Sequence, residues 1–316
     1  MPDSPKARVF STDQYIITLP QGHKFPVLKY GLLRSLLQQE GQFHFETAPP
    51  VELATVDLAH DRAYVRAFVE GRLSSAVMRR IGLPWSEALV QRALASVGGT
   101  ISAALDALAY GWGGTLGGGT HHAFRAHGAG FCVFNDIAVA IQFLRQAGRI
   151  LRAAVIDLDV HQGDGTAEIF AGDSGVFTLS IHCHNNFPFR KQHSSLDISL
   201  PDRMADAEYL LELDSALPKV FAFQPDIVFY QSGVDGLSTD LLGRLALTPQ
   251  GLIERDRKVF RTARSQGVPL ALTSGGGYSR PIELSVQSHA NTYRTAWEIY
   301  FGSGSKEPDL LPSPQR

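Results

Sequence analysis

The chain has 316 residues, 44% hydrophobic and 19% charged, so it is long enough to bury a large core. Its net charge is −2 with both signs spread along the chain, so we expect neither nucleic acid nor a membrane surface as a partner. Two cysteines are too few for a disulfide framework, no secretory leader is apparent, and no apolar stretch approaches the ~18 residues of a membrane helix, so we expect a cytoplasmic protein.

The first half of the chain is expected to begin with a short strand within residues 9–17. From Ser86, which stands at an N-cap position, apolar residues recur at helical spacing and predict a long helix. Gly98 and Gly99 inside it indicate close packing against a neighbour, since each glycine weakens a helix by roughly 1 kcal/mol. The glycine-dense segment 111–119 is expected to be a loop.

The second half contains short apolar runs without clean alternation. These predicted strands lie at 153–158, 176–181, 226–231 and 268–273, with helical stretches at 135–146 and 249–265. Such runs indicate strands buried on both faces, and interleaved helices indicate right-handed crossovers. We therefore predict an α/β fold with one open, mostly parallel sheet and helices on both faces. It would form a single domain at 1–301, followed by a disordered tail at 302–316.

Candidate metal ligands follow two of these strands. Asp159 and His161 come after the strand at 153–158, and Asp235 comes after the strand at 226–231. Ligands of open α/β sheets bind outside the carboxyl ends of the strands. An Asp-x-His pair in an extended segment places both side chains on one side, and Asp235 could complete a three-ligand site that leaves a position open for water.

A tandem pair of histidines, His121 and His122, precedes this region. The plain interpretation is that they cap the helix at 135–146 or form hydrogen bonds in the core. The functional interpretation uses Asp157 and Asp164 as partners, because a carboxylate behind an imidazole fixes its tautomer and raises its basicity.

Aromatic residues offer two further candidates. Tyr278 follows three glycines after the strand at 268–273, either as a packing residue or on a mobile loop that donates a hydrogen bond to an oxyanion. Phe131 and Phe187 are either core residues or the walls of an apolar substrate slot.

Several of these motifs occur in the order typical of one known family. They are GGTHHA at 118–123, GFCVFND at 130–136, DLDVHQGDG at 157–165, GVD at 233–235, DLLGRLALT at 240–248 and GGGY at 275–278. Together they resemble the zinc-dependent histone deacetylase superfamily, with its arginase/deacetylase fold, over about residues 20–300. Gln162, in place of a second histidine after His161, resembles the class IV branch and its bacterial relatives.

The resemblance implies a metal centre and a second ion. Zn²⁺, with Fe²⁺ as the alternative, would be bound by Asp159, His161 and Asp235. A structural K⁺ would be held by Asp157, by main-chain atoms of Asp159 and His161, and by Ser180.

The resemblance also implies catalytic roles. His122, backed by Asp164, would be the general base and then the general acid, and His121, backed by Asp157, would tune the electrostatics. Tyr278 would polarise the amide carbonyl.

The implied substrate is an acylated lysine or another acylated amine. Gly130, Phe131 and Phe187 would form the channel for its stem, and we expect longer acyl chains to react at least as well as acetyl. The alternatives are an acetylpolyamine or other small-molecule amide deacetylase, a binuclear manganese hydrolase of the arginase type, and a catalytically silent acyl-lysine binding module. The sequence predicts no oligomeric state.

Overall fold

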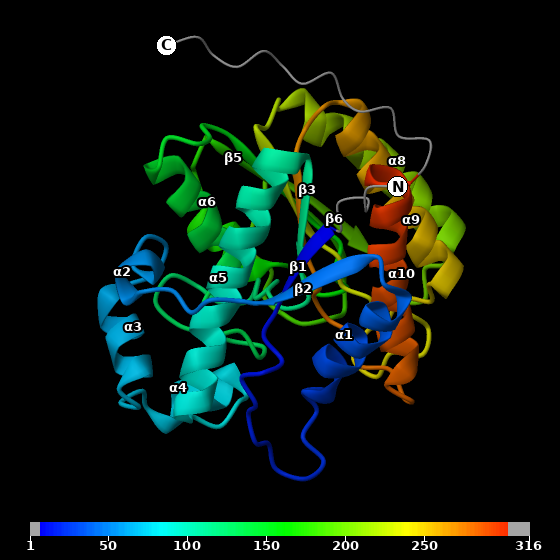
Figure 1. Cartoon of the computed structure of the whole chain (residues 1–316). Coiled ribbons are helices and arrows are strands. Elements are labelled where there is room, and N and C mark those ends of the chain that lie inside the picture. Colours follow the sequence, from blue (N-terminus) through cyan, green and yellow to red (C-terminus); the bar gives the residue numbers. More distant parts are fainter. Residues whose placement is uncertain (1–6, 303–316) are drawn as a thin grey trace.

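One parallel sheet organises the molecule. The computed structural model describes residues 7–302, and within them eight strands form a sheet in the order β2-β1-β3-β8-β7-β4-β5-β6, with every neighbouring pair parallel (Figure 1). The strands are β1 (Ala7–Ser11), β2 (Phe43–Thr47), β3 (Trp112–Thr115), β4 (Ala153–Asp157), β5 (Val176–Cys183), β6 (Leu196–Leu200), β7 (Ile227–Gln231) and β8 (Leu270–Thr273). The predicted fold class is confirmed.

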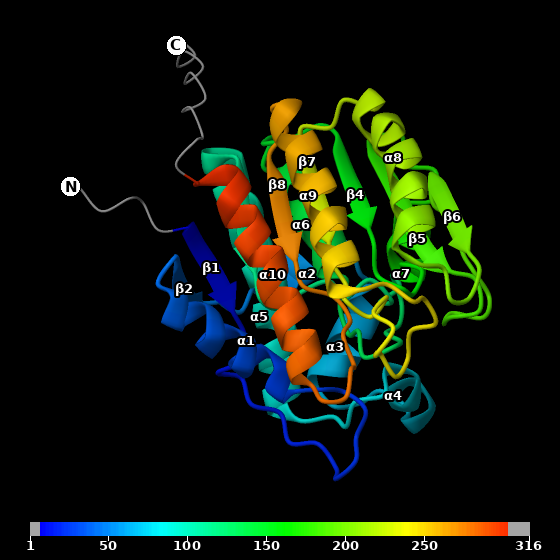
Figure 2. The same cartoon turned by 90° about the vertical axis from the view of Figure 1, so that its right-hand side faces the viewer.

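Helices cover both faces of the sheet. On one face lie α1 (Leu28–Glu40), α8 (Asp206–Ala222), α9 (Pro249–Ser265) and α10 (Glu283–Tyr300). On the other lie α2 (Leu53–Val56), α3 (Arg62–Val69), α4 (Ser75–Ile81), α5 (Glu87–Tyr110), α6 (Asp136–Gln146) and α7 (Asp164–Ile169). Figure 2 shows α8, α9 and α10 in front of the strands.

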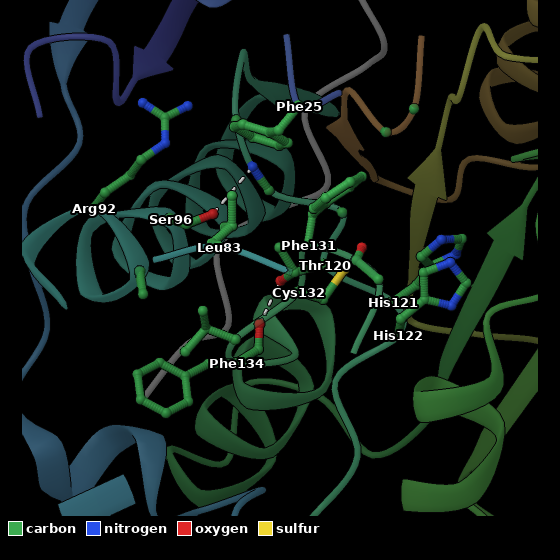
Figure 3. Close-up of a pocket in the computed structure, with 18 of the residues that line it drawn as sticks. Phe25, Leu83, Arg92, Ser96, Thr120, His121, His122, Phe131, Cys132 and Phe134 are labelled. Atoms are coloured by element: carbon green, nitrogen blue, oxygen red, sulfur yellow. Dashed lines mark hydrogen bonds between the residues drawn. The ribbon is translucent and has the colours of Figure 1, made fainter. Parts of the chain in front are cut away.

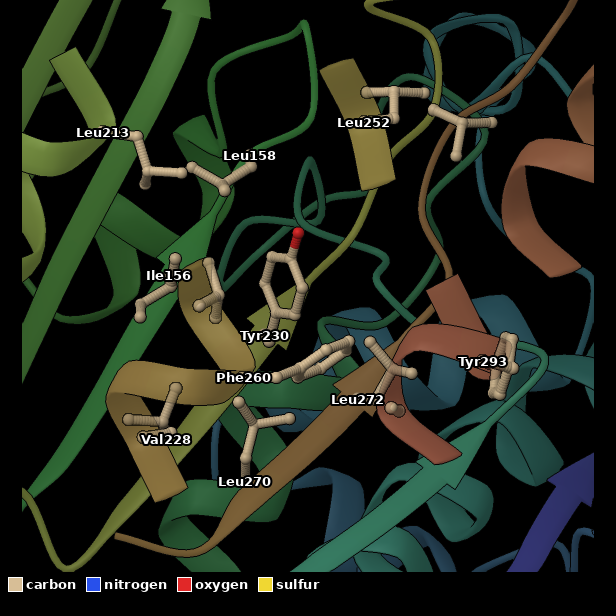
Figure 4. Close-up of a cluster of buried hydrophobic side chains, with 14 of the residues drawn as sticks. Ile156, Leu158, Leu213, Val228, Tyr230, Leu252, Phe260, Leu270, Leu272 and Tyr293 are labelled. Carbon is tan, nitrogen blue, oxygen red and sulfur yellow. The ribbon is translucent and has the colours of Figure 1, made fainter. Parts of the chain in front are cut away.

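The two layers of helices have separate hydrophobic cores because side chains alternate along each strand. In β7, Val228 and Tyr230 pack towards α8–α10, whereas Ile227 and Phe229 pack towards α5 and α6. Figure 4 shows Tyr230 beside Phe260 of α9 in the first of these cores. Strands buried on both faces read as continuous apolar runs, which explains why their sequences lack alternation.

Helix α5 confirms the predicted long helix. The Ser86 side chain accepts a hydrogen bond from the Leu89 backbone N–H at 3.1 Å, which makes it the N-cap. A Cβ added at Gly98 would lie 1.8 Å from the Pro49 carbonyl oxygen, so the glycine permits close packing. Contrary to the expectation from sequence, α5 is long and apolar enough to cross a membrane, but 67% of its apolar window is buried inside this fold.

The expected loop at 111–119 is wrong in part, because it contains β3, which lies between β1 and β8. A Cβ at Gly113 would lie 2.0 Å from the Ala103 carbonyl oxygen of α5. The glycines of this segment therefore serve close packing of a helix on a strand as well as chain reversal.

Other boundaries also differ from the sequence-based expectation. The early strand ends at Ser11 and does not include Tyr15–Ile17, and the edge strands β2 and β6 were not predicted. The expected tail at 302–316 lies outside the described residues from 303 onward.

Candidate metal centre and active site

The candidate residues come from four adjacent strands. His121 and His122 follow β3, Tyr278 follows β8, Asp235 follows β7, and Asp159 and His161 follow β4. Since β3, β8, β7 and β4 are neighbours and parallel, their carboxyl ends form one edge of the sheet. Ligands of open α/β sheets bind at such an edge.

The three candidate metal ligands lie in direct contact. His161 Nδ1 is 3.0 Å from Asp159 Oδ1 and 3.1 Å from Asp235 Oδ2, and the potential ligand atoms of all three lie within 4.8 Å of one another. The reason given from sequence is wrong, however. Strand β4 ends at Asp157, and both the backbone N–H and Nδ1 of His161 turn back to Asp159 Oδ1, so a turn rather than strand alternation brings the ligands together.

The charges of this cluster fit a cation. Burial raises the pKa of Asp235 to about 7, with the Asp159 charge as a further cause. Burial alone would lower the pKa of His161, but hydrogen bonds to Asp159 and Asp235 raise it to about 10. The cluster therefore holds positive charge between two buried carboxylates, and a divalent ion could replace that proton. Carboxylate oxygens and an imidazole nitrogen form a donor set that suits zinc.

Backbone groups hold the carboxylates in place. The Gly276 N–H donates to Asp159 Oδ2 at 2.8 Å, and the Val160 N–H donates to Asp235 Oδ1 at 2.9 Å. A Cβ at Gly276 would lie 1.9 Å from Asp235 Oδ2, so only glycine lets the backbone approach this closely.

Each histidine of the tandem pair is backed by its own carboxylate. His121 Nδ1 is 2.7 Å from Asp157 Oδ2, His122 Nδ1 is 2.6 Å from Asp164 Oδ1, and the two ring centroids are 4.1 Å apart. The capping interpretation is wrong, because Asn135 caps α6 by accepting from the Ala138 N–H.

The two imidazoles differ in charge. Burial, together with the neighbouring His121 charge, lowers the pKa of His122 to about 4. Burial also disfavours charge on His121, but the carboxylates of Asp157 and Asp159 outweigh it and raise its pKa to about 9. At neutral pH His122 is therefore free to accept a proton, and His121 supplies a positive charge beside it.

Tyr278 lies on an anchored loop. Its backbone N–H donates to Asp240 Oδ2 at 2.6 Å, and the buried Lys29 Nζ donates to the Gly275 carbonyl oxygen at 3.0 Å. These bonds hold the segment that was expected to be mobile. Burial, with the charges of Asp235 and Asp159, keeps the pKa of Tyr278 well above its usual value, so the phenol remains a hydrogen-bond donor.

A cavity of about 90 Å³ opens at this site. It is lined by the histidine pair, Asp159, His161, Tyr278, Gly130 and Phe131, and it continues inward to Arg92 of α5. Figure 3 shows Arg92 and the histidine pair at opposite sides, with Leu83 and Phe131 between them.

Phe187 occupies a different position from Phe131. Its ring meets the edge of His122 with centroids 4.9 Å apart, and 37% of the residue is exposed, but it does not line the cavity. A Cβ at Gly130 would lie 2.6 Å from His122 Cδ2 and 3.3 Å from Phe187 Cε1, so glycine is needed where these residues meet.

Sequence reasoning did not foresee how Gln162 fixes the loop that carries Phe187. Its side-chain amide donates to the Gln192 carbonyl oxygen and accepts from the Gln192 N–H, both at 2.8 Å, and it also donates to Asp197. The unusual residue after His161 was the available signal.

Ser180, proposed for potassium, pairs in register with Asp157, but its hydroxyl contacts His182 Nδ1 at 3.0 Å.

The segment that carries the histidine pair has further supports that the sequence did not reveal. Asp136, buried at the start of α6, accepts from the N–H groups of Gly119 and Thr120 at 2.9 and 2.7 Å. Thr100 of α5 donates to the same carboxylate at 2.5 Å. The carboxylate therefore ties the approach to the histidines to two helices.

An open parallel sheet carries these groups at its carboxyl edge, and they include a buried Asp–His–Asp cluster that could hold a metal ion. The sequence profile of the histone deacetylase domain matches residues 23–293, and the chain belongs to this family, whose members hydrolyse amides.

Two relatives and one solved structure illustrate the similarity. The chain is 44% identical over 290 residues to an uncharacterized protein from Picosynechococcus sp., covering 90% of this chain and 97% of that one. It is 36% identical over 276 residues to histone deacetylase 2 of Arabidopsis thaliana, covering 82% and 70% respectively. The crystal structure of an HDAC homologue from Aquifex aeolicus matches with a TM-score of 0.79 at 24% identity, covering 96% of this chain and 85% of that one, and it supports the fold. The class IV assignment stays a prediction.

Proposed function

We propose that this protein is a zinc-dependent deacylase that hydrolyses the amide of acylated lysine. One observation carries the proposal: His161 Nδ1 lies against two buried carboxylates at the same sheet edge as the Asp164-backed His122. Family membership supports amide hydrolysis.

The metal would be bound by Asp159, His161 and Asp235. When bound, Zn²⁺, or Fe²⁺ in its place, supplies a Lewis acid that polarises the acyl carbonyl and lowers the pKa of water. We also propose that a structural K⁺ binds beside Asp157 and Ser180, which pair in register on β4 and β5. Among residues 7–302, one cluster of Asp and His side chains has metal-ligand geometry, which favours a single catalytic ion over a binuclear centre.

The chain's own residues would move the protons. His122 Nδ1 is engaged by Asp164, so Nε2 accepts the proton of the attacking water. Tyr278 donates its hydroxyl proton in a hydrogen bond to the oxyanion of the tetrahedral intermediate. His122 then passes its proton to the amine nitrogen as the C–N bond breaks, which releases a carboxylic acid and a free amine. Because all these groups are present, a silent binding module is disfavoured.

The cavity constrains the acyl group. Its volume of about 90 Å³ is smaller than the ~150 Å³ of a cavity that binds benzene. Acetyl and short acyl groups therefore fit best, and the volume weighs against the expectation that longer chains react equally well.

Metal-loaded protein assayed on acetyl-, octanoyl- and myristoyl-lysine peptides and on acetylated polyamines tests this function. We expect acetyl-lysine hydrolysis that is lost on chelation and restored by Zn²⁺. If the active protein contains no transition metal, or if no acyl-lysine peptide is hydrolysed, the proposal is wrong.

A further inference from the structure

A second, larger cavity adjoins the reaction cavity. It is a groove of about 610 Å³ lined by residues within 19–28, 241–242 and 278–282. Phe25 and Tyr278 line both cavities, so the groove begins at the residue that faces the reacting carbonyl in the proposed function. Any group attached to the acylated lysine has this groove beside it.

The groove carries unpaired positive charge. Lys24 and Arg280 line it, and in the part of the chain that the structure describes neither side chain has a hydrogen bond or ion-pair partner. His23 is engaged elsewhere: Nε2 is 2.9 Å from the Gly82 carbonyl oxygen, and Nδ1 accepts from the Phe25 N–H. Among residues 7–302, no Asp or Glu lines the groove, and Asp159, a candidate metal ligand, is the single acidic residue lining the reaction cavity.

The rest of the groove is largely apolar and open to water. Leu28 is 73% exposed and Leu241 is 57% exposed, and Ile282 lies between Arg280 and the start of α10. Such apolar surface beside unpaired cations favours a ligand that presents an aliphatic group together with an anion.

We propose that this groove binds the substrate segment next to the acylated lysine and selects an aliphatic residue beside an acidic one. The inference rests on the proposed function, because it places the acylated lysine at Tyr278. Successive residues of an extended peptide lie about 3.3–3.6 Å apart, so residues one or two positions away reach the groove. Cationic substrates, including acetylated polyamines and lysine-rich tails, would meet the like charge of Lys24 and Arg280.

The test uses three acetyl-lysine peptides. On each side of the acetyl-lysine they carry Leu followed by a second residue, which is Glu, Gln or Lys. We expect kcat/KM to decrease in the order Glu, Gln, Lys. Each exposed cation contributes roughly 1.5- to 5-fold to this preference. In the double variant Lys24→Gln/Arg280→Gln, the kcat/KM of the Glu peptide should therefore fall to within about twofold of that of the Lys peptide. High salt should compress the wild-type ratio as well. Arg149→Gln, an exposed cation just before β4 at the opposite edge of the sheet, should leave the ratio unchanged.

Binding of the same peptides, labelled with fluorescein and measured by anisotropy, tests the groove independently of hydrolysis. Equal kcat/KM and equal affinity for the Glu and Lys peptides would overturn the inference, as would an unchanged ratio in the double variant. A concentration-dependent dimer that the peptides fail to dissociate would assign the groove to a second copy of the chain. Failure to hydrolyse even the Gln peptide, with the binding preference intact, would instead contradict the proposed function.

Discussion

His60, which is buried between α2 and α3, is expected to make the fold sensitive to acid. Its Nδ1 lies 3.0 Å from the Phe124 carbonyl oxygen and its Nε2 accepts from the Asn135 N–H at 2.8 Å. The neutral ring with its proton on Nδ1 satisfies both contacts. A proton on Nε2 would oppose the N–H of Asn135, the N-cap residue of α6.

Burial lowers the pKa of His60 from 6.5 to about 4. The unfolded chain therefore binds this proton more readily than the folded chain. The stabilisation of the fold by the neutral ring is complete above pH 6.5 and is lost as pH falls towards 4. At ~1.4 kcal/mol per pH unit, the full loss is about 3 kcal/mol of unfolding free energy.

Urea unfolding of the wild type and His60→Gln at pH 7.5 and 4.5 measures this effect. Glutamine keeps an acceptor for the Asn135 N–H but does not titrate, and the other titrating groups are common to both proteins. We expect the wild type to lose about 2 to 3 kcal/mol more than the variant between these pH values. Equal losses would refute the reasoning about His60.

Three further predictions concern the site. Asp235→Ala should abolish stoichiometric metal binding, because two protein ligands rarely hold zinc. A metal content equal to that of the wild type in elemental analysis would contradict the ligand assignment. Tyr278→Phe should lower kcat by about 10² to 10³ with metal content unchanged, and a kcat near that of the wild type would make the tyrosine a packing residue. His122→Ala should lower kcat at least as far and His121→Ala less far, and the reverse ranking in the same assay would exchange their roles.

The central strands and the ligand cluster could be predicted because their signals are local. Continuous apolar runs marked β4 and β7, and the polar residues directly after them had to meet at one edge of a parallel sheet. Strand β3 was hidden because glycines at 113 and 114 resemble a loop unless the helix packed against them is known. The edge strand β6 is only partly buried, so it lacks a continuous apolar run.

Supports from distant parts of the chain could not be predicted. The bond from Lys29 to the Gly275 carbonyl oxygen joins residues 246 positions apart, and the pairing of Gln162 with Gln192 spans 30. No periodicity within a short window encodes such contacts. The motifs indicated which residues meet at the site, whereas the groups that hold them depend on the complete fold.

The strand order has a consequence for synthesis of the chain. Strand β8 is the last to be made, yet it alone joins the β2-β1-β3 half of the sheet to the β7-β4-β5-β6 half. At 5–20 residues per second, roughly 8 to 30 s separate the emergence of Thr115 from that of Leu270 on the ribosome. During this interval the inner edge of β3 has no partner strand, and the same holds for the inner edge of β7 once Gln231 has been made. The histidine pair belongs to the first half and the Asp159–His161–Asp235 cluster to the second, so the late strand β8 aligns the two parts of the site.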